Sequence, residues 1–97
     1  MIDKQYLKSK PGCRVTFMLP EGLKIKTAQL VGDFNDWDIT ATPMSAQDDQ
    51  FQVTLELETG QEYQFRYLIN DQEWYNDWNA DKYVPNPFGG DNSVVVT

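Results

Sequence analysis

The chain has 97 residues, of which 40% are hydrophobic and 24% are charged. These values are typical of one compact domain, and the length excludes enzymes built on large barrels or doubly wound sheets. The sequence has no histidine and one cysteine, Cys13. Catalytic triads that use histidine, zinc sites that need it and internal disulfides are therefore excluded as well.

Charge is distributed unevenly along the chain, whose formal net charge is −7. Residues 1–26 carry six lysines or arginines against two acids, whereas residues 27–97 carry two against thirteen. Binding to a phosphate backbone needs basic density over the working surface, so we expect no nucleic-acid partner. We interpret residues 1–13 as a basic, solvated N-terminal arm, with docking to a partner as the alternative. Residues 14–97 are the single expected domain.

No segment is apolar over the roughly 18 residues of a membrane span, and the first ten residues lack the apolar stretch of a signal peptide. No internal repeat or low-complexity tract is present. We therefore expect a soluble protein in the cytoplasm, without a membrane partner.

Apolar residues alternate with polar ones at a period of two wherever a period can be read, which predicts β-strands. Strands are expected at 14–19, 24–31, 51–57, 63–69 and 94–96. The segments between strands are rich in Asp, Asn, Gly and Pro, which favour turns, as at Pro20–Gly22 and Phe88–Asp91. No window has a convincing helical face. An all-β antiparallel sandwich of about seven or eight strands follows, with a core drawn from Val15, Phe17, Leu30, Val53, Leu55, Phe65, Tyr67 and Val95.

All three tryptophans lie outside the predicted strands, in loops rich in Asn and Asp. Trp37 follows Phe34 in one loop, and Trp74, Tyr75 and Trp78 share another. An indole offers a wide apolar face, and a pyranose ring has apolar C–H faces within a rim of hydroxyls. Indole and amide groups together therefore favour sugar binding. The alternative for each tryptophan is that it caps one end of the sandwich.

Other chemical patterns are weaker. Asp77–Asp81 imitates the start of a calcium-binding loop, but Lys82 and Phe88 stand where an EF-hand needs glycine and a bidentate acid. An irregular calcium site stays open as an alternative. Nothing singles out two of the fifteen acids as a pair for glycoside hydrolysis, and a solvated acidic surface explains them. We therefore predict no metal site, no cofactor and no catalytic residues.

Four ordered motifs resemble one known family. Leu30–Trp37, with the sequence LVGDFNDW, is similar to the G-x-F-N-x-W signature of carbohydrate-binding module family 48. The similarity continues through Tyr63–Asn70, Trp74–Asp77 and Pro85–Val94, and it covers nearly all of residues 14–97. That family includes the N-terminal domains of isoamylase and glycogen branching enzymes. It resembles the glycogen-binding domain of the AMP-activated protein kinase beta subunit.

The resemblance implies an immunoglobulin-like, early-set β-sandwich that binds α-1,4-linked glucans such as glycogen, starch and maltooligosaccharides. By motif, Trp37 and Trp74 match the stacking tryptophans, and Arg66 and Asn92 match the polar binding residues. Arg66 lies on the strand face opposite to Phe65 and should point to solvent. We expect the polar ends of Arg66 and Asn92 to be free for sugar hydroxyls. The alternatives are a surface ion pair for Arg66 and an Asx turn for Asn92.

The implied function is a non-catalytic module that recruits a partner, such as a glycogen-metabolising enzyme, to polysaccharide. Trp78 departs from the pattern because relatives often have proline there, and it either extends the aromatic platform or caps the core. The sequence also lacks the catalytic domain that is attached to most bacterial members. The alternative function is a protein-interaction module that keeps the fold and has lost sugar binding. A small glycosidase ranks last.

Overall fold

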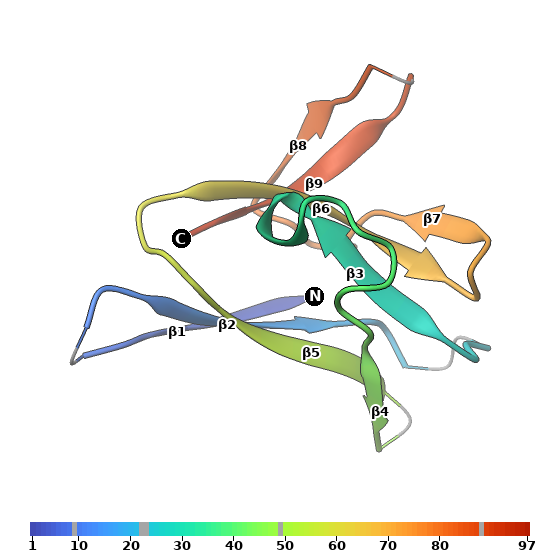
Figure 1. Ribbon diagram of the computed structural model, residues 1–97, viewed down its shortest axis with the longest axis horizontal. Helices are drawn as coiled ribbons and strands as arrows, with labels where there is room; N and C mark the ends of the chain where they lie inside the picture. The colour runs from blue at the N-terminus through green and yellow to red at the C-terminus, as the bar shows by residue number, and fades with distance from the viewer. Residues whose placement is uncertain (9, 22–23, 49, 88) are drawn as a thin grey trace.

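The computed structural model describes residues 1–8, 10–21, 24–48, 50–87 and 89–97, and it arranges them as two antiparallel β-sheets packed face to face (Figure 1). One sheet has four strands in the order β1 (Ile2–Tyr6), β2 (Cys13–Met18), β5 (Gln50–Leu57) and β4 (Ser45–Gln47). The other has five strands, with β3 (Ala28–Gly32), β6 (Glu62–Ile69), β9 (Asp91–Val96) and β8 (Lys82–Pro85) in that order and β7 (Glu73–Tyr75) paired with β6. The predicted all-β antiparallel sandwich is confirmed.

The helix that follows β3 is a short 3-10 turn, η1 (Asp33–Asn35). Within the described residues, no helix has the length and apolar character needed to cross a membrane. Figure 1 shows β8 and β9 projecting from the five-stranded sheet and β7 at its periphery. The expected turns at Pro20–Gly22 and Phe88–Asp91 include residues 22 and 88, which lie outside the described residues.

The core lies between the two sheets and follows the predicted alternation. Three aromatic residues are fully buried: Phe17 of β2, and Phe65 and Tyr67 of β6. Their immediate neighbours along each strand face the opposite side of the sheet. Phe17 and Phe65 meet edge to face, with ring centroids 5.0 Å apart. Among the predicted core residues, Val53 and Leu55 pack half-buried against the cluster, and the buried ones are Val15, Phe17, Leu30, Phe65, Tyr67 and Val95.

Four strands were not predicted, because β1, β4, β7 and β8 have only three to five residues each and are mostly polar or exposed. Such short strands show no readable period of two. Conversely, the strand expected at 24–31 begins only at Ala28. The Asn70 side-chain oxygen accepts hydrogen bonds from the backbone N–H groups of Lys26 and Thr27, at 2.7 and 3.2 Å. Lys26 and Thr27 are therefore held by the Asn70 side chain, and not by the strand pairing that was predicted for them.

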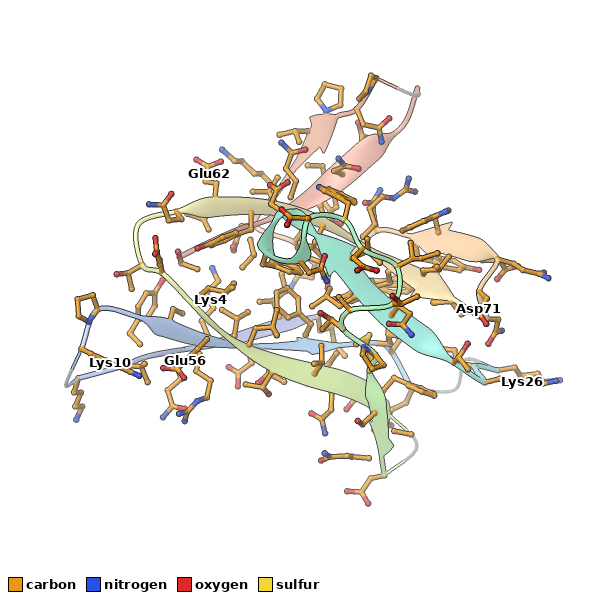
Figure 2. All side chains as sticks on the ribbon, viewed as in Figure 1. Lys4, Lys10, Lys26, Glu56, Glu62 and Asp71 are labelled. Carbon is orange, nitrogen blue, oxygen red and sulfur yellow. The ribbon has the colours of Figure 1, made fainter. Side chains whose placement is uncertain are left out.

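The N-terminal segment expected as a solvated arm contributes strand β1, which pairs antiparallel with β2. The Lys4 ammonium binds the Asp81 carboxylate at 2.6 Å, so β1 is also tied to the segment before β8 in the other sheet. Lys10 pairs with Glu56 at 2.9 Å. Figure 2 shows Lys10 and Lys26 at opposite ends of the molecule. The basic residues of the first 26 positions therefore do not form one continuous patch.

Phe65→Ala is expected to reduce the free energy of unfolding by about 3–5 kcal/mol, because it removes a fully buried ring from the core. Urea unfolding followed by tryptophan fluorescence measures this loss. Tyr6→Ala is the control, because Tyr6 is 54% exposed and its truncation should change stability by about 0.5 kcal/mol or less. An equally small effect of Phe65→Ala would contradict the described core.

Acidification should weaken the tie between β1 and the other sheet. Partial burial raises the pKa of Asp81, but hydrogen bonds from the Lys4 ammonium and the Val96 N–H outweigh burial and hold that pKa below its ordinary value. A carboxylate with a lowered pKa stabilises the fold above its ordinary pKa, and this contribution is lost as the pH falls through the folded-state value. The stability of Asp81→Asn should therefore fall less steeply than that of wild type below about pH 4. Thermal unfolding across the acidic range tests this, and parallel curves for the two proteins would refute it.

Candidate functional site

A groove of about 550 Å³ opens on the outer face of the five-stranded sheet. Six side chains line it, from the loop after η1, β6, β7 and the β8–β9 hairpin: Trp37, Arg66, Trp74, Asn86, Pro87 and Asn92. The structure thus brings together the four residues that the sequence indicated for sugar binding. Sequence reasoning missed Asn86 and Pro87 as lining residues, although the Pro85–Val94 motif contains both.

The groove rests on a second apolar layer. Val31, Leu68 and Val94 are almost fully buried, yet strand alternation places them on the outer face of the sheet, away from the core cluster. Val31 stands opposite Arg66 in the β3–β6 ladder, and Leu68 stands opposite Trp74 in the β6–β7 ladder. The long side chains therefore cover the shorter ones, and the groove residues have a packed support beneath them.

A tight loop after β3 positions Trp37. The backbone of Gly32 is extended, but a Cβ atom there would lie 2.5 Å from a backbone carbonyl oxygen of β6, so a larger residue does not fit without a shift. The Asn35 side chain closes the loop, because its oxygen accepts from the Gly32 N–H at 3.0 Å and its amide donates to the Leu30 carbonyl at 2.9 Å. The chain then turns through the left-handed region at Asp36 and Trp37, where φ is 56° and 57°.

Asp33 fixes the orientation of the first indole. The Trp37 Nε1–H donates to Asp33 Oδ1 at 2.9 Å, and the backbone N–H of Gln64 donates to Asp33 Oδ2 at 2.8 Å. One carboxylate therefore ties the indole to β6, and the half-exposed ring is held in place without a ligand. Sequence reasoning missed this role. The available signal was the place of Asp33 inside the signature segment, four residues before the tryptophan.

Arg66 packs against the second indole. Its guanidinium carbon lies 6.0 Å from the centroid of the Trp74 ring, a cation–π contact. Trp74 remains 42% exposed, so much of the indole faces solvent. Within the part of the chain that the structure describes, Arg66 makes no ion pair, and its Nε atom is buried without a hydrogen-bond partner. The donors that can reach the oxygen atoms of a ligand are therefore those of the two terminal nitrogens of the guanidinium.

Asn92 is less free than expected. Its Oδ1 accepts from Asn86 Nδ2 at 3.2 Å, and its Nδ2 donates to Gln64 Oε1 at 3.0 Å. The three amides thus form a polar row beside the indoles. Because an amide has two donors and two acceptor positions, Asn92 keeps one of each for a ligand. Gln64 was missed at the sequence level, although it lies on the same strand face as Arg66.

The third loop tryptophan does not belong to the groove. Trp78 stacks on Tyr75 with ring centroids 5.9 Å apart and planes 15° apart, and it tilts over the buried Tyr67 at 6.3 Å. The contact with Tyr67, a core residue, supports the expected role of Trp78 as a cap on the core. Trp78 nevertheless remains 46% exposed.

Asp77, the first residue of the calcium-like segment, is used inside the fold. Its Oδ2 accepts a 2.5 Å hydrogen bond from the Tyr67 hydroxyl, and its backbone N–H donates to Ser93 Oγ at 2.8 Å. Burial and the neighbouring carboxylate raise the pKa of Tyr67 well above its ordinary value, so the hydroxyl stays protonated as the donor. Among the described residues, no group of three or more Asp, Glu, Cys or His side chains is placed to hold a metal ion.

The groove therefore combines two partly exposed indoles, a guanidinium and a row of amides above an apolar support. The family described as the glycogen recognition site of AMP-activated protein kinase matches residues 12–96. The chain belongs to this family. Its members are carbohydrate-binding modules without catalytic activity of their own. No curated protein matches the chain. The glycogen-recognition match runs from just before β2 to the end of β9, so β1 lies outside it.

Asp33→Ala should weaken glucan binding by the glycogen-recognition module about three- to tenfold, because the loss of the hydrogen bond to Trp37 frees the indole. Asp33→Asn keeps one side-chain oxygen and should recover part of the affinity. Maltoheptaose titration followed by calorimetry measures both effects, and thermal unfolding confirms that the variants fold. Wild-type affinity in Asp33→Ala would show that the carboxylate does not position the ring.

Proposed function

We propose that this module binds α-1,4-linked glucans, such as glycogen, starch and maltooligosaccharides, in the groove and does not cleave them. The observation that carries the proposal is the convergence of Trp37, Arg66, Trp74 and Asn92 on one groove, from positions far apart in the sequence. Membership of the glycogen-recognition family supports the same conclusion.

The chemistry of the groove matches the surface of a glucan. The C–H faces of successive glucose rings stack on the two indoles, which lose little conformational entropy because their surroundings already hold them. The Arg66 guanidinium donates to hydroxyl groups at the ring edges, and the amide of Asn92 both donates to and accepts from them. Flat stacking with a few exposed hydrogen bonds gives weak affinity, with Kd on the order of micromolar to millimolar.

Weak, non-destructive binding suits a recruiting role. We propose that the module holds a partner, such as a glycogen-metabolising enzyme, at the surface of the polysaccharide, as the accessory N-terminal domains of glycoside hydrolase family 13 enzymes do for their own catalytic domains. We place this role in the cytoplasm. The lone cysteine, which is buried and unpaired, suits a reducing compartment.

Trp74→Ala should lower the affinity for maltoheptaose or β-cyclodextrin by on the order of 1–3 kcal/mol, by analogy with aromatic stacking on nucleobases. Its melting temperature should change little, because the indole is 42% exposed. Trp37→Ala should lose a similar amount of binding and about 1 kcal/mol of stability, because Trp37 is half-buried and bonded to Asp33. Calorimetric titration and thermal unfolding of the same preparations give both numbers.

Trp78→Ala is the matched control, since it removes a similarly exposed tryptophan that does not line the groove. Its affinity for β-cyclodextrin should equal that of wild type. If neither ligand binds the wild-type protein, the sugar-binding proposal fails and the protein-interaction alternative takes its place. If Trp37→Ala and Trp74→Ala lose stability and keep full affinity, the two indoles are structural and the groove is not the site.

A further inference from the structure

Tyr75 and Trp78 form an exposed aromatic pair that the groove does not use. The two rings are nearly parallel, and their exposed fractions are 39% and 46%. The side of Trp78 toward the protein is held by Tyr67. The pair is therefore a fixed aromatic stack, called the plate below, which is anchored on the core through Trp78 and partly exposed to solvent.

Tyr75 of the plate directly follows Trp74 of the groove in the sequence. Trp74 and Tyr75 are consecutive in β7, so their side chains point to opposite faces of the sheet, although their Cα atoms are only about 3.8 Å apart. Among the described residues, β7 pairs with β6 alone, and its other edge is open. Figure 1 shows β7 at the periphery of the sheet. A ligand that leaves the groove over Trp74 therefore reaches Tyr75 by passing around a single strand edge.

Polar groups border the plate, as they do the indoles of the groove. The Tyr75 hydroxyl donates to a carboxylate oxygen of Glu73 at 3.1 Å, so a hydroxyl and a carboxylate border the rings. The open edge of β7 adds backbone N–H and C=O groups that can pair with hydroxyls. Two rings are far smaller than the roughly 800 Å² that each partner buries in a standard protein interface. A neutral polyhydroxyl chain fits this plate better than a protein surface does.

We propose that an α-glucan chain bound in the groove continues around the open edge of β7 and packs against the exposed surfaces of Tyr75 and Trp78. This inference rests on the proposed function and extends it, because it makes the module selective for long, linear stretches of glucan. A short oligosaccharide fills only the groove. A closed ring such as β-cyclodextrin also binds only there, since it has no free chain to pass around the edge.

Calorimetric titration with maltotetraose, maltododecaose and β-cyclodextrin tests the proposal on wild type, Tyr75→Ala and Trp78→Ala. Tyr6→Ala is the control, because it removes an exposed tyrosine on β1. We expect Tyr75→Ala and Trp78→Ala to bind maltododecaose about tenfold more weakly than wild type does, as the loss of one stacking ring predicts. Affinity for maltotetraose and β-cyclodextrin should not change. Tyr6→Ala should match wild type with all three ligands.

Other results overturn the proposal. Unchanged maltododecaose binding in Tyr75→Ala would show that the chain does not reach the plate, and the proposed function would stand without the extension. An equal loss for all three ligands would show that Tyr75 acts only through Trp74. Two equivalents of β-cyclodextrin per protein would mean a second independent site in place of one continuous path. If Trp78→Ala does not fold, the maltododecaose affinity of Tyr75→Ala alone decides whether the proposal holds. Absence of binding by wild type to every ligand rejects the proposed function itself.

Discussion

Strand β6 has a packed layer on each of its two faces, and the rest of the molecule depends on this constraint. Phe65 and Tyr67 pack into the core, while Arg66 and Leu68 form part of the outer layer. A slip of one residue in the β6 ladders would exchange these two sets, so burial of the aromatic rings fixes the register. Because the same strand carries Phe65 and Tyr67 of the core and Arg66 of the groove, burial of the two rings also fixes the position of Arg66. Little ordering is then left for the binding step.

The signature segment acts mainly through the backbone. Of its residues, only Trp37 lines the groove. Gly32 permits close approach to β6, Asn35 closes the loop, and Asp33 holds the indole. These roles need a specific hydrogen-bonding group or the absence of a side chain, and none of them depends on a hydrophobic side chain. The motif therefore indicates a loop that positions Trp37 in the groove. The other groove residues come from other parts of the chain.

The long strands and the core could be predicted because burial on one face produces a period of two, as in β5 and β6. The short strands could not, because three residues such as Glu73–Tyr75 pair through their backbone and carry no readable pattern. For the site, a family resemblance indicated Trp37, Arg66, Trp74 and Asn92 as candidates. It could not indicate that Asn92 is engaged at both ends of its amide, because Gln64 and Asn86 approach it only in the folded chain.

Trp37 occupies a backbone conformation that large side chains rarely adopt, with φ at 57°. Holding a residue other than glycine in that region is unfavourable by about 1–2 kcal/mol. Glycine would relieve this strain and would also delete the indole, so folding and ligand contact favour different residues at position 37. Where the groove no longer serves a ligand, only the packing of the half-buried indole and its hydrogen bond to Asp33 oppose this strain. The residue found at this position is therefore a sensitive marker of whether a descendant of this chain still needs its groove.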